Sequence, residues 1–146
     1  MHFVKSCAFF GHRYYDYEPF EDKLEKIIEN LINLGVTEFY CGERGYFDAY
    51  CRSTVAKLRK KYPQIRLILV LSYRPNKNFV LPTYYDESVY LLEEKVPLKF
   101  AICHTNRELI KLVDCVVVAV CHTFGGAFAA CTYANRLEKK VINILI

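Results

Sequence analysis

Three loops in the sequence carry residue types that bind phosphate, and each follows a segment of strand character. The first loop holds Gly11, His12 and Arg13. Glycine lets the backbone approach a ligand closely, and the planar guanidinium of arginine matches the oxygens of a phosphate. A tight turn with a surface arginine would use the same residues, and a histidine beside a glycine often only hydrogen-bonds its loop. The position after a strand favours a binding role for the group.

The second loop contains two glycines, Gly42 and Gly45, with Arg44 between them and Asp48 after them. Glycines that lead into a helix leave the backbone N–H groups of its first turn able to receive an anion. Asp48 falls within that first turn, where an acid also complements the helix dipole. Taken alone, the capping role is favoured for Asp48.

The third loop runs from His122 to a helix that Gly125 and Gly126 open, and small residues follow them. The full G-x-G-x-x-G pattern is absent, and so is the lysine of a P-loop. Two glycines alone are a weak signal. Three strand ends that each carry glycine with arginine, histidine or threonine together predict an anion-binding site.

Other kinds of site find little support in the sequence. No Ser-His-Asp, Cys-His or paired-carboxylate arrangement can be placed, and the four histidines show no metal-ligand spacing. The seven cysteines are odd in number and contain no C-x-x-C pair, which argues against a disulfide framework or a zinc site. We therefore expect no metal, no cofactor and a cytoplasmic protein with reduced thiols.

The segments between these loops alternate between strand and helix periodicity. Apolar runs predict strands over 3–10, 36–41, 65–71, 115–121 and 141–146. Helical spacing begins at Pro19 and stops at Gly35, and it returns over 47–58, 99–113 and 125–137. Residues 73–95 break the rhythm, so we expect a long excursion over the sheet edge, with a short extended piece near 88–91. Such loops are uncommon without a function, and a lid over a site is a natural one.

This order predicts an α/β fold: a Rossmann-like three-layer sandwich with a mostly parallel sheet of about five strands. Right-handed crossovers would place helices on both faces, and a ligand would bind at the carboxyl ends of the strands. A chain of 146 residues has the size of one domain, so we expect residues 1–146 to form a single domain.

Charge and hydropathy limit the partners. The net charge of +4 suits an anionic small molecule and is small for a protein that binds nucleic acid. The N-terminal segment has neither the form of a signal peptide nor the length of a membrane span. With twelve tyrosines and ten phenylalanines, exposed aromatic side chains could also pair two copies in a homodimer.

The motifs as a set resemble the SLOG superfamily, which includes the lonely-guy phosphoribohydrolases and DNA-processing protein A. The resemblance starts with Cys-Ala-Phe-Phe-Gly-His-Arg at 7–13 and ends with Val-Ile-Asn at 141–143. Between them it passes through 39–42, 45–48, 97–101, Asn106, Arg107, Asp114 and the Gly125-Gly126 pair. It spans nearly the whole chain in order, and the chain looks like one of the short stand-alone SLOG proteins of bacteria and their mobile elements.

The resemblance implies a nucleotide site at the predicted loops and adds Asn106 and Arg107, which periodicity alone places on an ordinary helix surface. The lonely-guy signature P-G-G-x-G-T-x-x-E is not matched. After Gly126 come Ala-Phe-Ala-Ala-Cys, without the second glycine-threonine and without the catalytic glutamate. The departure argues against hydrolysis of a nucleoside monophosphate by the lonely-guy mechanism.

The leading hypothesis is a binding module that senses or sequesters a nucleotide or nucleotide-derived phosphate ligand. Arg13 and the glycine amides would hold phosphate, and Asp48 would bind a ribose hydroxyl or orient Arg13. The first alternative is a hydrolase of N-glycosidic or phosphoester bonds that uses Asp48 or Glu43. The second is single-stranded DNA binding through the tyrosines, which the small net charge disfavours.

Overall fold

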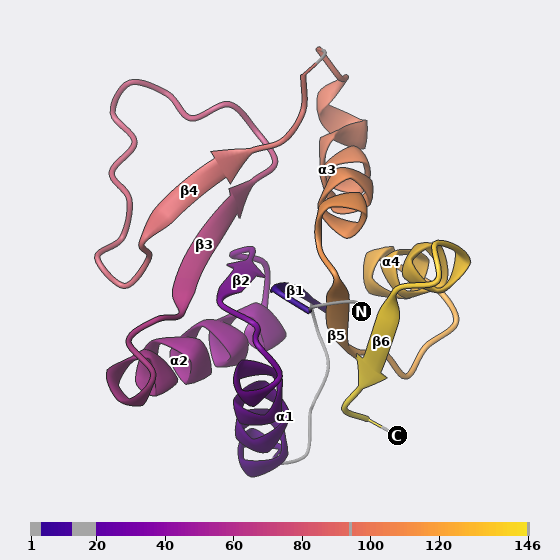
Figure 1. The fold of residues 1–146 in the computed structure, drawn as a ribbon. Helices are drawn as coiled ribbons and strands as arrows, with labels where there is room; N and C mark the ends of the chain where they lie inside the picture. The colour runs from indigo at the N-terminus through magenta and orange to yellow at the C-terminus, as the bar shows by residue number, and fades with distance from the viewer. Residues whose placement is uncertain (1–3, 13–19, 94, 146) are drawn as a thin grey trace.

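The protein was analysed as a computed structural model that describes residues 4–12, 20–93 and 95–145. Strands and helices alternate along these residues, except that two strands, over 66–71 and 87–90, follow one another without a helix between them (Figure 1). The strands are β1 (Ser6–Gly11), β2 (Glu38–Cys41), β3 (Arg66–Leu71), β4 (Glu87–Tyr90), β5 (Cys115–Ala119) and β6 (Lys140–Asn143). The helices are α1 (Glu21–Asn33), α2 (Tyr46–Lys61), α3 (Leu98–Leu112) and α4 (Gly126–Arg136).

The six strands form one sheet in the order β4-β3-β2-β1-β5-β6, and every pairing is parallel. The predicted α/β class is confirmed, but the sheet has six strands where the sequence predicted about five. The additional strand is β4, which lies at the edge and pairs Ser88 with Leu69 of β3. Its residues are only partly buried, so they lack the apolar run that marks the inner strands.

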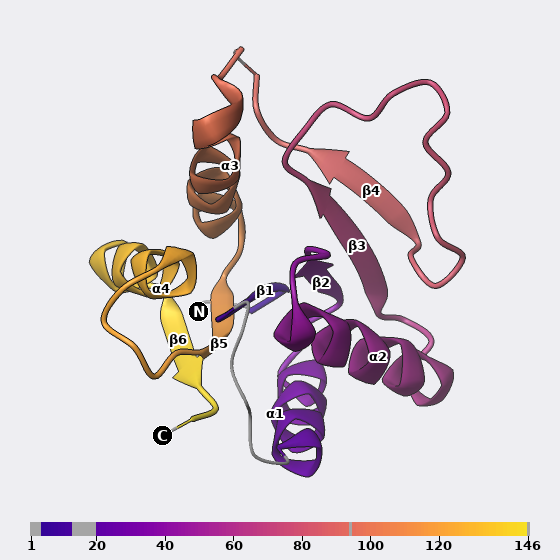
Figure 2. The same cartoon turned by 180° about the vertical axis from the view of Figure 1, so that it is seen from behind.

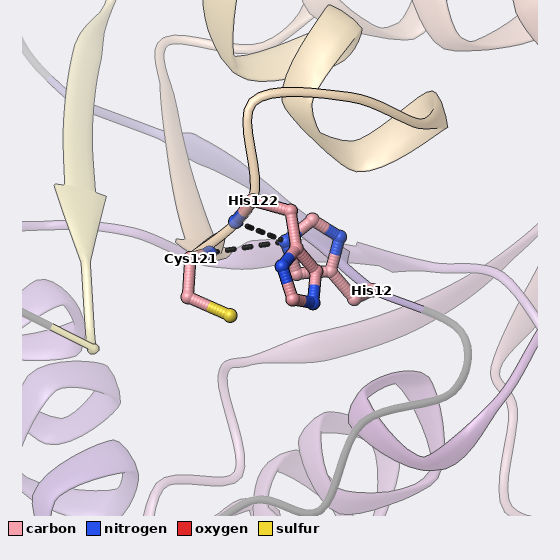
Figure 3. Close-up of side chains that lie close together, drawn as sticks. All are labelled: His12, Cys121 and His122. Carbon is pink, nitrogen blue, oxygen red and sulfur yellow. Dashed lines mark hydrogen bonds between the residues drawn. The ribbon is translucent and has the colours of Figure 1, made fainter.

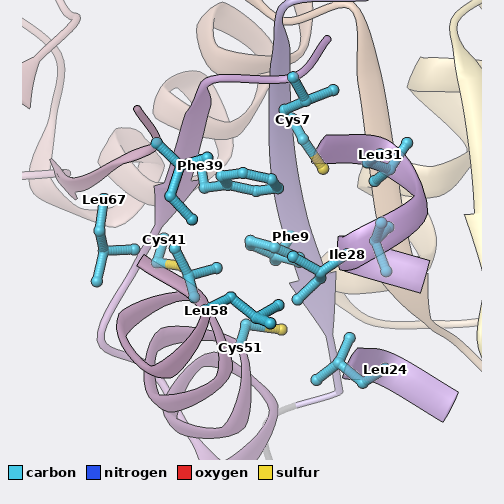
Figure 4. Close-up of a cluster of buried hydrophobic side chains, with 14 of the residues drawn as sticks. Cys7, Phe9, Leu24, Ile28, Leu31, Phe39, Cys41, Cys51, Leu58 and Leu67 are labelled. Carbon is cyan, nitrogen blue, oxygen red and sulfur yellow. The ribbon is translucent and has the colours of Figure 1, made fainter. Parts of the chain in front are cut away.

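Helices cover both faces of the sheet, with α1 and α2 on one side and α3 and α4 on the other (Figure 2). Alternate strand residues point to opposite faces, because the side-chain period of a strand is two. Phe9 and Phe39 pack with α1 and α2 (Figure 4), whereas Phe10 and Tyr40 pack with α3 and α4. The inner strands are thus buried on both faces, as their continuous apolar runs predict.

The order of the strands reverses beside β1. The chain leaves β1 toward β2, β3 and β4, and then returns through α3 to place β5 on the opposite side of β1. In doubly wound sheets a crevice opens at such a reversal, beyond the carboxyl ends of the strands. Among the described residues no helix is both long and apolar enough to cross a membrane.

Candidate functional site

A cavity of about 580 Å³ lies at the carboxyl ends of the strands. Its walls come from the ends of β1, β2 and β3, from the segment after β5, from one side of α3 and from the first turn of α4. The volume falls within the range of about 300–1,000 Å³ that is usual for small-molecule sites. The cavity therefore occupies the place where the fold predicts a ligand.

Most of the predicted site residues line this cavity: Gly11, His12, Gly42, Arg44, Asp48, Asn106, Gly125 and Gly126. Gly45 and Arg107 do not. Gly45 is the N-cap of α2, and the exposed Arg107 guanidinium lies 5.3 Å from the centre of the Tyr133 ring of α4. Arg13 lies outside the described residues.

The N-terminus of α4 opens directly onto the cavity. Gly125 caps the helix with φ of 92°, and neither a capping side chain nor an acidic residue occupies the first turn. A Cβ placed on Gly125 or on Gly126 would meet no atom within 4 Å. Both glycines thus border open space, and because they line the cavity with Ala127, the positive end of the helix dipole lies at the cavity wall.

The N-terminus of α2 differs, because the helix carries its own anion there. The Asp48 carboxylate accepts a hydrogen bond from the Arg44 backbone N–H at 2.9 Å. The same oxygen would lie 3.2 Å from a Cβ on Gly42, so that glycine leaves room for the carboxylate. The sequence predicted an anion site at the start of both helices. In the structure α2 has an acid in its first turn and α4 has none.

Asp48 is a buried carboxyl group whose pKa is raised above the ordinary aspartate range. Burial raises its pKa to about 6, although the Arg44 amide and the nearby guanidinium groups of Arg44 and Arg52 act in the opposite direction. A carboxyl group in this range can exchange a proton with a bound molecule at physiological pH.

Replacing Asp48 with asparagine should stabilise the protein at neutral pH and leave it unchanged in acid. The folded-state pKa lies above the ordinary aspartate value of 3.8, so the stability contributed by protonated Asp48 is lost as the pH rises to about 6. Asparagine keeps an oxygen for the Arg44 amide and carries no charge. Melting temperatures measured from about pH 4 to about pH 8 should separate in this window. A difference in melting temperature between the two proteins that stays constant from about pH 4 to about pH 8 would contradict the raised pKa of Asp48.

Thr105 supplies a buried polar group on the cavity wall. Its side chain is 1% exposed, and its Oγ1 has no hydrogen-bond partner in the described part of the chain. An unpaired hydroxyl at such a position is costly, by about 1–3 kcal/mol. Sequence reasoning missed Thr105 because it falls on the buried stripe of α3, between Ala101 and Leu109. A polar residue within that apolar stripe was the available signal.

Arg44 and Ser72 meet on another wall, where Arg44 Nη2 donates a hydrogen bond to Ser72 Oγ. Ser72 is buried and immediately follows β3. Sequence reasoning passed over Ser72 because it starts the long 73–95 excursion, yet its position after a strand matches that of the three predicted loops.

His12 ties β1 to the segment after β5 (Figure 3). Its Nε2 accepts hydrogen bonds from the backbone N–H groups of Cys121 at 3.0 Å and of His122 at 3.1 Å. Burial, and next the neighbouring His122, lower the pKa of His12, in keeping with a neutral imidazole whose Nε2 is an acceptor. The His122 ring in turn stacks on that of Phe124 at 5.1 Å.

His12, Cys121 and His122 also place potential metal-ligand atoms within 4.8 Å of one another, a cluster that their sequence spacing did not predict. The donor types suit a transition metal such as zinc. However, two backbone N–H groups already point at Nε2 of His12, so a cation bound there would face the positive ends of both dipoles. We therefore assign this cluster to anchoring the loop.

Two of the solved structures that match this chain are of DNA processing protein A. DNA processing protein A from Streptococcus pneumoniae matches 94% of this chain with a TM-score of 0.67 and 20% identity. The same protein from Helicobacter pylori matches 94% with a TM-score of 0.65 and 17% identity. The fold is similar to that of DNA processing protein A. The parallel sheet and the helices that cover it form a Rossmann-like α/β fold.

The likeness is one of fold, since both identities are low. The chain spans 49% of the length of the Streptococcus pneumoniae protein and 64% of that from Helicobacter pylori. No protein-family model matches the sequence, and no curated protein matches it.

Proposed function

We propose that the cavity binds a nucleotide or nucleotide-derived phosphate ligand, with a phosphate at the N-terminus of α4. The observation that carries the proposal is Thr105, a buried hydroxyl without a partner on the wall of a cavity that also receives a helix N-terminus. A phosphate oxygen would accept from this hydroxyl and from the amides after Gly125, so that one anion satisfies both walls.

The other walls suit the rest of a nucleotide. Asp48 accepts hydrogen bonds and can hold a ribose hydroxyl, while Asn106 offers both a donor and an acceptor. Val70 and Leu109 give the cavity apolar surface, and Phe124 is an exposed ring at the start of α4 on which a base can stack. On this proposal the chain is a single SLOG-like domain that acts as a sensor or binding module. Its seven free cysteines favour a reducing, cytoplasmic location.

Replacing Thr105 with valine should stabilise the ligand-free protein against unfolding and weaken ligand binding. Valine has the shape of threonine and removes the unpaired hydroxyl, so the free energy of unfolding should rise by about 1 kcal/mol. In the complex the variant lacks the hydrogen bond from the Thr105 hydroxyl to the charged phosphate. The dissociation constant for the tightest-binding nucleoside 5′-monophosphate should therefore rise roughly 10-fold.

Chemical denaturation and calorimetric titration would measure the two effects. Thr105→Ser is the matched control, because it keeps the hydroxyl and should bind within about threefold of the wild type. Stability and affinity that fall together in Thr105→Val would indicate a packing role for Thr105 and count against the proposed contact.

Hydrolysis of the bound nucleotide is a second candidate, favoured by the pKa of about 6 at Asp48 in the cavity wall. Such a carboxyl group can take a proton from an attacking water or give one to a leaving group. Chromatography of a nucleotide panel after incubation with the wild type and with Asp48→Asn decides this. Products that appear only with the wild type would establish hydrolysis, and intact nucleotides would leave a binding module.

Single-stranded DNA is a third candidate, because the similar protein from Helicobacter pylori binds it. Binding of this chain to an oligodeoxynucleotide should then weaken steeply with salt, as phosphate neutralisation requires. Fluorescence anisotropy at two salt concentrations is sufficient, and an affinity independent of salt would exclude this mode.

A further inference from the structure

A second cavity of about 500 Å³ adjoins the first and is lined by the end of β3 and the chain that follows it. Arg44, Val70 and Ser72 line both cavities, so these residues form the boundary between them. The hydrogen bond between Arg44 and Ser72 holds the guanidinium at this boundary. The two cavities thus share one cationic wall, and the site described above is only one half of a larger concave region.

Aromatic rings border the second cavity. Tyr73 is 46% exposed and Phe79 is 38% exposed, and both line it. A turn fixes the position of Phe79: its backbone N–H donates to the Asn76 carbonyl at 3.0 Å, and the Asn78 N–H donates to Asn76 Oδ1 at 2.9 Å. Half-exposed rings beside amide side chains are the surfaces on which a nucleic-acid base stacks and hydrogen-bonds.

Charge at the second cavity favours an anion over a cation. Arg44 and Arg74 line it, and among the described residues Glu43 is the only acid on its wall. The Glu43 carboxylate is already engaged, since it lies 3.6 Å from Arg52 and accepts a hydrogen bond from the Tyr84 hydroxyl at 3.4 Å. A negatively charged linker can therefore pass the boundary at Arg44 without meeting an uncompensated carboxylate.

From this geometry we propose that the ligand contains two nucleosides joined through phosphate, the second of which occupies the cavity bordered by Tyr73 and Phe79. The linking phosphate lies at Arg44, and the terminal phosphate lies at the N-terminus of α4. The inference rests on the proposed function, because it extends the same ligand from the first cavity into the second. A mononucleotide would fill the first cavity alone.

The test compares mononucleotides with dinucleotides in wild type and in Phe79→Ala. The probes are AMP and the 3′–5′ linked dinucleotide pApA, which carries both a terminal and a linking phosphate, each titrated by calorimetry, with the other three bases as parallel series. Val80→Ala is the matched control, since Val80 is 82% exposed, neighbours Phe79 and does not line either cavity.

We expect a dinucleotide to bind at least about 10-fold more tightly than the matching mononucleotide, since stacking of one base on an aromatic ring has about this effect. Phe79→Ala should remove that advantage and leave mononucleotide binding within about twofold of the wild type. Val80→Ala should change neither affinity.

Three results would overturn the inference. Equal affinities for mono- and dinucleotides would leave the proposed function standing and remove only the second subsite. A dinucleotide advantage that survives in Phe79→Ala would place the second base elsewhere. Affinity that keeps rising from pApA to longer oligoadenylates would identify single-stranded nucleic acid as the ligand. Absence of binding by every probe would instead count against the proposed function itself.

Discussion

Replacing Gly126 with aspartate should abolish phosphate binding in a protein that is at least as stable as the wild type. Gly126 is the first residue of α4, and a Cβ added there meets no atom within 4 Å. A carboxylate in the first turn complements the helix dipole, and a glycine is removed from a helix, so each change favours folding. The same carboxylate occupies the space proposed for the phosphate.

The expected loss of affinity in Gly126→Asp is about 100-fold or more. Two charges about 5 Å apart at an effective dielectric constant of about 20 repel by about 3 kcal/mol. Gly126→Asn has the same size without the charge and should bind within about 10-fold of the wild type. Calorimetric titration with nucleoside 5′-monophosphates measures the affinity, and urea denaturation measures the stability. Equal affinities in the two variants would show that no anion lies at this helix end.

Replacing Gly11 with alanine should destabilise the fold by about 3 kcal/mol or more, at the upper end of the range for overpacked cores. A Cβ on Gly11 would lie 2.4 Å from Cδ2 of Phe47 and 2.6 Å from its Cβ. Phe47 is fully buried in the first turn of α2, so rotation of its ring cannot relieve the second contact. The helix itself must move away from β1.

A double-mutant cycle tests this cause. Phe47→Ala removes Cγ and the ring and destabilises the core by itself, and since only the Cβ contact then remains, adding Gly11→Ala to it should cost less than adding it to the wild type. The melting temperature of Gly11→Ala should fall by roughly 6–12 °C for a domain of this size. Additive losses in the cycle would show that Phe47 is not the obstacle, and a stable Gly11→Ala protein would contradict the close packing altogether.

The fold was largely predictable because its inner strands are buried on both faces. The run 65–71 and the run 115–121 have no polar alternation, and both became central parts of the parallel sheet. The edge strand β4 was less visible, since Glu87 and Ser88 make its sequence polar and only one side of it pairs with another strand. An edge strand buries fewer side chains than an inner strand, so its sequence shows a weaker apolar pattern.

The sequence predicted where the candidate site lies better than it predicted what each of its residues does there. Gly11 was expected to admit a ligand, and the atoms that approach it most closely belong to Phe47 of the core. Two helix starts carried the same glycine signal, and the sequence placed an acid, Asp48, at only one of them; the structure adds that this acid accepts a hydrogen bond from the Arg44 amide. The roles of such residues depend on contacts across the sheet, which spacing along the chain does not encode.

Thr105 and Ser72 were out of reach for a related reason. Each is a small hydroxyl residue in a segment with another evident use, a helix stripe for Thr105 and the start of a long loop for Ser72. What gives them chemical meaning is burial beside a cavity, a property of the folded chain. The second cavity also depends on how residues 72–79 fold back, and no periodicity predicts that.

The most direct test of the account is the calorimetric titration of the wild-type protein with the four nucleoside 5′-monophosphates and with the four matching nucleosides, in a phosphate-free buffer. The account predicts that at least one monophosphate binds and that its nucleoside binds at least about 30-fold more weakly, because the charge-assisted bonds at α4 and Thr105 are lost. A nucleoside that binds as tightly as its monophosphate would contradict the account, and so would a protein that binds none of the eight compounds.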